Sequence, residues 1–276
     1  MALPLHASAA ERVWYYALRL IAALVLFYLI VPILIITPLS FNSEPYFSYP
    51  MPGLSLRWYE DFFFNERWQA ALRNSVIVAV STTCVATTLG TIAALGLSRP
   101  NFPARGLVMS FLIAPMIVPL IISAVGMYFF YTDIGLANTL SGMVLAHTAL
   151  ATPFVVITVT ATLTGFDHTL TRASQSLGAN LVTTFFRVQM PLILPGIISG
   201  GLFAFVTSFD EVVVALFISS AETRTLPKQM FSGIREMISP TITAAATLLV
   251  LFSTVLLTTI ELLRRRNERM RGIRAS

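Results

Sequence analysis

Two neighbouring carboxylates, Asp210 and Glu211, interrupt an apolar stretch that runs from about residue 188 to 219. An ionised carboxylate inside a membrane costs about 3 kcal/mol, so such a group usually faces a cavity or a partner. Because neighbouring helix positions point about 100° apart, one acid can face a pathway while the other meets another helix. We predict a solute pathway or gate formed by Asp210 and Glu211 with Ser208 and Phe209, suited to a cation. A structural ion pair and a hydrogen-bond cap on a broken helix are the alternatives.

His147 is a further titratable group within an apolar span. A single histidine in such a place is more often a packing or hydrogen-bonding group than a proton relay. With one histidine and two adjacent acids, an ion-coupled secondary carrier is short of relay groups, but it stays open as the alternative to an ATP-driven transporter.

The chain carries no recognisable chemistry for ATP hydrolysis. A phosphate-binding loop needs Gly-x4-Gly-Lys-Ser/Thr, and the one lysine, Lys228, follows Pro227 without a Gly-rich loop. We therefore expect no catalytic site here, and hydrolysis in a separate polypeptide. The single cysteine, Cys84, allows no intrachain disulfide, and we predict neither a metal site nor a cofactor.

Helices that cross a membrane must position these groups. The chain has 276 residues, of which 56% are hydrophobic and 11% charged, whereas soluble domains carry about 25% charged residues. Its apolar runs are continuous rather than alternating, which favours helices over a barrel. We predict an all-α membrane protein with one domain over residues 1–276. Its six transmembrane helices are expected over about 14–37, 72–97, 106–127, 142–164, 192–218 and 241–263.

The basic residues predict the orientation of these spans. Twelve arginines lie on the side that holds both termini, and six lysines and arginines lie on the other side. Because cytoplasmic loops are enriched in basic residues, we expect both termini in the cytoplasm. The basic residues stand at span ends, which indicates contact with anionic lipid headgroups rather than with nucleic acid.

A polar loop over about 165–191 separates the fourth and fifth spans on the predicted cytoplasmic side. Residues 169–177 can form a short helix that Gly178 ends, because glycine tolerates the left-handed conformation found there. Asn180 can cap a second helix over 181–188, and Pro191 is expected to stop that helix.

Two aromatic side chains, Phe185 and Phe186, fall among polar residues of the second short helix. They would be costly in water unless they meet a partner or pack on the transmembrane helices. The loop is also longer than a plain connection needs. From the residues alone, docking of a partner and a plain connection both stay open.

Small residues begin the fifth span. Gly196 and Gly200 form a small-x3-small step that allows close approach of another helix. Together with Pro195 they would also let the helix flex, which suits alternating access. Close packing is the simpler explanation of the glycines.

The loop resembles the cytoplasmic loop of binding-protein-dependent ABC importer permeases, whose pattern is Glu-Ala-Ala, three residues, Gly, about nine residues and Ile-x-Leu-Pro. In this chain Arg172-Ala173-Ser174 stands at the Glu-Ala-Ala position, Gly178 at the Gly position, and the run PLILP at the end. Arg172 and Ser174 depart from the pattern. The segments NSVIVAVSTTCVATTLGTIAALGLSR and SFDEVVVALFIS resemble the second permease of spermidine/putrescine-type importers.

The resemblance implies a type I ABC importer permease fold in the bacterial inner membrane. It implies a heterodimer with a second permease, together with two cytoplasmic ATPases and a periplasmic binding protein. The helix over 181–188 then resembles the coupling helix that sits in a cleft of the ATPase. The implied solute is a polyamine or a related cationic or zwitterionic metabolite. Besides the importer and the ion-coupled carrier, a membrane scaffold without transport is a third possible function. The predicted coupling residues are Arg172, Ala173, Ser174, Gly178, Ala179, Asn180, Phe185 and Phe186.

Overall fold

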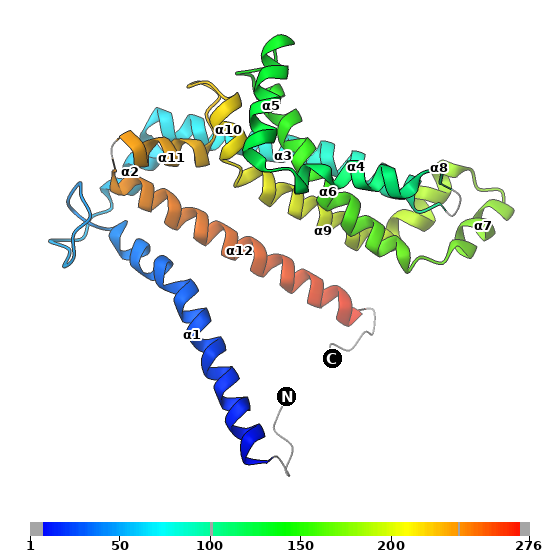
Figure 1. Ribbon diagram of the computed structural model, residues 1–276, viewed down its shortest axis with the longest axis horizontal. Coiled ribbons are helices and arrows are strands. Elements are labelled where there is room, and N and C mark those ends of the chain that lie inside the picture. The colour runs from blue at the N-terminus through cyan, green and yellow to red at the C-terminus, as the bar shows by residue number, and fades with distance from the viewer. Residues whose placement is uncertain (1–7, 100–101, 237, 271–276) are drawn as a thin grey trace. The chain divides into compact units, whose positions relative to one another are not determined.

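The computed structural model describes residues 8–99, 102–236 and 238–270, and the regular secondary structure in these residues is entirely helical. Contacts divide the chain into two compact units: unit 1 is Met1–Asn65 with Gly233–Ser276, and unit 2 is Glu66–Ser232. The helices of unit 1 are α1 (Ala9–Leu39), α2 (Arg57–Phe64) and α12 (Pro240–Met270) (Figure 1). Those of unit 2 are α3 (Glu66–Leu97), α4 (Arg105–Ile117), α5 (Leu120–Asp133), α6 (Leu140–Thr164), α7 (His168–Ser176), α8 (Leu181–Thr184), the π-helix η1 (Phe185–Gln189), α9 (Met190–Phe209) and α10 (Val213–Ile218). The remaining helix, α11 (Leu226–Glu236), crosses the boundary between the units.

Among the described residues, four helices are long and apolar enough to cross a membrane: α1, α3, α6 and the continuous stretch Leu181–Phe209. The bent pair α4 and α5 makes a fifth if it counts as one span. Where the sequence predicts the sixth span, α12 provides a shorter apolar helix, Pro240–Leu256. The predicted all-α membrane protein is therefore confirmed.

Two of the expected spans are broken rather than straight. In place of one helix over 106–127, α4 and α5 meet at a bend of 100°. Val118, directly before Pro119, is extended (φ −67°, ψ 133°), because the proline ring disfavours helical geometry in the preceding residue. The helix expected over 192–218 is likewise interrupted, since α9 ends at Phe209 and α10 begins at Val213.

Unit 1 holds the first and last long helices. A capping box begins α1, in which Ser8 Oγ accepts from the Glu11 amide and the Glu11 carboxylate accepts from the Ser8 amide. The short helix α2 packs on α12, where the Thr241 hydroxyl donates to Asp61 Oδ2 at 2.7 Å. The apolar side chains along α1 are exposed within the chain, as expected of a helix surrounded by lipid or a partner.

Unit 2 is built around α3, α6 and α9, which lie side by side (Figure 1). Their shared core consists largely of small side chains, so the helix axes can approach closely. A Cβ atom added to Gly200 would lie 2.6 Å from Thr158 Oγ1 and 3.0 Å from the Val155 Cα on α6. The close approach predicted from Gly196 and Gly200 is thus confirmed, because side chains of α6 fill the space beside both.

Candidate coupling loop and pathway residues

The polar loop forms two short helices joined by a tight turn. Asp167 caps α7 by accepting from the Thr169 amide at 2.8 Å. Gly178 has φ +85°, the left-handed conformation that glycine adopts without strain. Asn180 then caps α8 by accepting from the Thr183 amide at 2.8 Å. The predicted roles of Gly178 and Asn180 in the turn are confirmed.

Two side-chain contacts hold the turn closed. Ser174 Oγ lies 3.0 Å from Thr184 Oγ1, and Gln189 Nε2 donates to Thr171 Oγ1 at 3.2 Å. Thr184 is buried, so its hydroxyl would lose its partner if residue 174 had no hydroxyl group. Neither contact is evident from the sequence, because the turn angle decides which faces of the two helices meet.

Pro191 does not stop the second helix, contrary to the prediction. The chain continues from α8 through η1 into α9, and Leu181–Phe209 is one helical stretch of 29 residues. Within η1 the Met190 amide bonds to the Phe185 carbonyl, one residue further back than in an α-helix. This wider turn relieves the clash of a proline ring with the preceding turn. The predicted coupling helix over 181–188 therefore forms the first turns of the helix that carries the fifth span.

Apolar side chains of the loop point in two directions. Leu177, Leu181 and Phe186 are 89%, 72% and 57% exposed. Phe185 instead packs against the core of unit 2, and its ring contacts that of Phe186 edge-on at 4.9 Å between centroids. Of the other predicted coupling residues, Arg172, Ala173 and Asn180 are exposed and Ala179 is half-buried. The loop thus combines an inward aromatic anchor with an exposed apolar surface.

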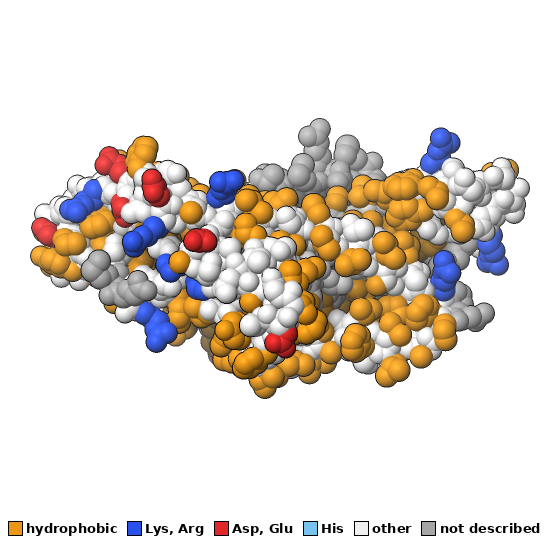
Figure 2. Space-filling view, turned by 90° about the horizontal axis from the view of Figure 1, so that it is seen from above, with side chains coloured by type: hydrophobic (Ala, Val, Ile, Leu, Met, Phe, Trp, Pro, Cys, Tyr) orange, Lys and Arg blue, Asp and Glu red, His pale blue; other side chains and the backbone are white. Residues whose placement is uncertain are grey.

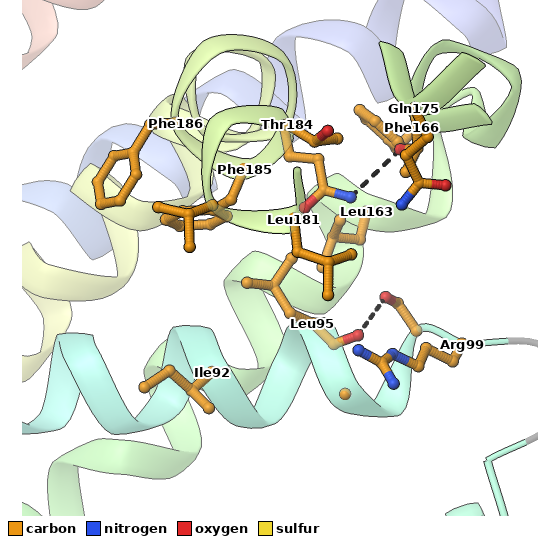
Figure 3. Close-up of a pocket in the computed structure, with 15 residues that line it drawn as sticks. Ile92, Leu95, Arg99, Leu163, Phe166, Gln175, Leu181, Thr184, Phe185 and Phe186 are labelled. Atoms are coloured by element: carbon orange, nitrogen blue, oxygen red, sulfur yellow. Dashed lines mark hydrogen bonds between the residues drawn. The ribbon is translucent and has the colours of Figure 1, made fainter. Parts of the chain in front are cut away.

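A cavity of about 1040 Å³ lies between this loop and the ends of α3 and α6. Figure 3 shows Leu95 on α3 and Arg99, just after the end of α3, facing it from one side, and Leu181, Thr184 and Phe185 from the other. Apolar side chains form most of its wall, and Arg99 is the one charged residue among the 15 that line it.

The predicted pathway residues lie at the other end of the same long helix, as Figure 1 shows for α8, α9 and α10. Ser208 is buried, and its Oγ lies 2.9 Å from Nδ1 of the buried His147 on α6. Phe209 stacks on Phe205, with ring centroids 5.5 Å apart. The structure therefore uses Ser208 in a contact between two helices of this chain.

The two acids occupy different environments. Glu211 is half-buried and its Oε1 accepts from the Val214 amide at 2.9 Å, which caps α10. This is the helix-cap alternative named above. Asp210 follows the last residue of α9 as its C-cap and is exposed, and its carboxylate has no hydrogen-bond or ion-pair partner in the described part of the chain.

The opposite end of α10 meets a cation. Lys228 Nζ donates to the Ser219 carbonyl at 2.7 Å, where the negative end of a helix favours positive charge. Burial lowers the pKa of Lys228, and the charge of Arg224 lowers it further. The short helix α10 is thus fixed at its start by Glu211 and at its end by Lys228.

Comparisons with known proteins agree with this architecture. The family described as "Binding-protein-dependent transport system inner membrane component" matches residues 86–270. This chain belongs to that family. The permease is 33% identical over 240 residues to the spermidine/putrescine transport system permease protein PotC of Haemophilus influenzae, covering 87% of this chain and 93% of PotC. It is 32% identical over 232 residues to the putrescine transport system permease protein PotI of Escherichia coli K12, covering 81% of this chain and 82% of PotI.

The fold of the permease is that of known importers. A crystal structure of a bacterial ABC transporter that imports the acidic polysaccharide alginate superposes with a TM-score of 0.73. The matched region covers 95% of the permease and 99% of the chain in that crystal structure, at 15% sequence identity. The predicted importer permease fold is confirmed. Family and fold together support a transport subunit of an ABC importer over an ion-coupled secondary carrier.

Proposed function

We propose that this permease forms, with a second permease, the membrane pathway of an ATP-driven importer for polyamines or related cationic metabolites. The observation that carries the proposal is the match to two polyamine permeases along most of the chain. A periplasmic binding protein would deliver the solute, and two cytoplasmic ATPases would drive the cycle. Both termini would then lie in the cytoplasm.

The loop supplies a surface for an ATPase. Leu181, Val182 and Phe186 are exposed on the first turns of the long helix, and a cleft in a partner would bury them. Because α8 continues through η1 into α9 without a break, movement of the ATPase pair would pass directly into the fifth span. Phe185, packed on the core, would carry part of the same movement to α3 and α6.

Asp210 supplies the charge for a cationic solute. The stretch Leu181–Phe209 has 29 residues and is about 40 Å long at 1.5 Å per residue, so Asp210 lies one membrane thickness from the loop. A single exposed carboxylate binds a cation weakly enough to release it. Glu211 holds α10 in place beside it, which fixes the direction in which the helix resumes.

The test is purification in mild detergent followed by uptake in proteoliposomes. Mass spectrometry of the purified material should identify a P-loop ATPase and a second multi-pass permease. Reconstitution with the binding protein should then give uptake of radiolabelled spermidine or putrescine that depends on internal ATP.

A chain that purifies alone and transports under an ion gradient would overturn the proposal in favour of a secondary carrier. Gly178→Arg is the decisive variant for the loop, because φ at this position is +85°, which a non-glycine residue adopts only with strain, and the long charged side chain would project from the exposed turn. Unchanged ATP-dependent uptake by this variant would remove the loop from coupling.

A further inference from the structure

We infer that the cavity between α3, α6 and the coupling loop is a binding site for one anionic phospholipid. Its headgroup would lie at Arg99 and an acyl chain would follow α3 toward the middle of the membrane. This inference goes beyond the proposed transport function and does not depend on which solute is carried. It rests on the charge of the cavity, on a stripe of exposed residues that leads into it, and on its size.

The charge of the cavity favours an anion. None of the 15 lining residues is acidic, and Arg99 is exposed at the rim. Within the described residues, no carboxylate or carbonyl accepts a hydrogen bond from its guanidinium. Gln175 is also exposed and lines the cavity, and its side-chain amide makes no hydrogen bond within the described residues. Both groups are hydrogen-bond donors that suit a phosphate group, whereas a polyamine would meet a positive charge at Arg99.

The surroundings carry the same sign. On the face drawn in Figure 2, the charged side chains visible at the end of unit 2 that carries α7 are all basic. The acid at this end, Asp167, already accepts from the Thr169 amide. An anionic headgroup would therefore be attracted to this end of the spans, where basic residues are each worth about 1 kcal/mol for such lipids.

An apolar stripe on α3 leads into the cavity from the membrane. Val85, Leu89 and Ile92 follow at intervals of four and three residues, so they share one face of the helix, and they are 37%, 52% and 62% exposed. Gly96 lies on α3, which ends at Leu97, and Arg99 follows in the turn directly after the helix; both residues line the cavity. The exposed face of α3 thus offers a path for a hydrocarbon chain, and Arg99 lies just beyond the end of the helix.

The cavity is large enough for this ligand. Pockets of about 300–1,000 Å³ hold drug-sized molecules, and this one has about 1040 Å³. Its inner wall of Leu95, Leu163 and Phe185 suits an acyl chain rather than a hydrated anion. The ligand that fits has one anionic head and a long apolar body, which is the chemistry of a phospholipid.

The experiment measures lipid retained by the purified full-length chain, with whatever partners accompany it. Native mass spectrometry counts phosphatidylglycerol and phosphatidylcholine molecules that survive removal of the detergent micelle. We expect one retained phosphatidylglycerol per chain and a clear preference over phosphatidylcholine. Arg99→Gln should reduce retention about fivefold, the loss expected for one basic contact at a headgroup.

Two further variants sharpen the test. Gly96→Phe should abolish retention by filling the cavity, because a Cβ there meets only the Phe102 ring, at 3.9 Å, and the backbone need not move. Arg105→Gln is the matched control, since Arg105 begins α4 but does not line the cavity. It should retain phosphatidylglycerol as the wild type does. Size-exclusion profiles establish that each variant is folded, and if Gly96→Phe is not, the comparison of Arg99→Gln with Arg105→Gln decides alone.

Four results would overturn the inference. Retention could be the same in Arg99→Gln as in the wild type, or equal for the two lipids. Glycerol phosphate could displace phosphatidylglycerol at a concentration similar to that of the lipid. This would mean that the site binds phosphate and that the acyl chain has no role in binding. Finally, a photo-crosslinker placed at Ile92 could capture a segment of a partner subunit instead of lipid, which would make the cavity a protein interface.

Discussion

The Ser174 hydroxyl lies 3.0 Å from the Thr184 hydroxyl, and this contact joins α7 to α8 across the turn at Gly178. Ser174 stands where the importer pattern has its second alanine, so this chain adds a hydrogen bond to the loop. The partner hydroxyl is buried, which makes it costly to leave unpaired.

Removing the Ser174 hydroxyl should loosen the turn. We expect Ser174→Ala to reduce local stability by about 1 kcal/mol, the net worth of one such bond. Hydrogen exchange of the amides in residues 181–184 should then be about fivefold faster. The double variant Ser174→Ala/Thr184→Val should add little to this change, because the interaction is already lost. Additive effects would mean that the two hydroxyls act separately.

Replacements of Gly178 can distinguish an effect of the backbone conformation from an effect of side-chain crowding. A Cβ there meets nothing within 4 Å, while φ is +85°, so Gly178→Ala acts through the backbone alone. We expect a cost of about 1–2 kcal/mol in the turn and reduced ATP-dependent uptake. Gly178→Asn is the control, since asparagine tolerates this conformation, and its uptake should stay near that of the wild type. Equal uptake by both variants would show that the left-handed turn is not required.

The two acids should differ in their response to neutral substitutions. Asp210→Asn removes the exposed charge, and we expect KM for a cationic solute to rise about tenfold, equivalent to about 1.4 kcal/mol of binding. Glu211→Gln keeps an oxygen that can accept from the Val214 amide, so uptake should change little. Glu211→Ala removes the cap and should destabilise the region by about 1 kcal/mol. The comparison requires uptake kinetics and thermal unfolding in detergent. A loss in Glu211→Gln as large as in Glu211→Ala would assign a charge-dependent role to Glu211.

A methyl group at Gly200 should disturb the packing of α9 on α6. The added Cβ would lie 2.6 Å from Thr158 Oγ1 and 3.0 Å from the Val155 Cα. We expect Gly200→Ala to destabilise the protein by about 1–3 kcal/mol, the cost of overpacking, and to lower its unfolding temperature. Gly126→Ala on α5 is the control, because a Cβ there meets nothing within 4 Å. Thr158→Ala should rescue Gly200→Ala only in part, because the Val155 backbone remains.

The parts of the fold that depend on local chemistry could be predicted from the sequence. The turn at Gly178, the cap at Asn180, and the close approach at Gly200 all follow from properties of single residue types. The bend at Val118 and Pro119 has a local cause too, since the residue before a proline avoids helical geometry.

The remaining features depend on contacts or register that composition does not reveal. The His147–Ser208 contact joins residues 61 positions apart, and helical periodicity cannot select that partner. Pro191 is tolerated because one turn widens into a π-helix, which needs the surrounding helix to be held in place. Glu211 caps a new helix only because α9 ends just before it. The single domain over residues 1–276 and the roles of the coupling and pathway residues stay predictions.

The uninterrupted helix from Leu181 to Phe209 fixes the angular phase between the loop and the acids. Each residue advances a helix by 1.5 Å and turns it by about 100°. The number of residues between Phe186 and Asp210 therefore sets the direction around the helix axis in which Asp210 points relative to Phe186. Insertion of one residue in α9 would leave both ends chemically intact but turn the carboxylate about 100° away. Spacing along this helix, as well as residue type, is therefore under constraint.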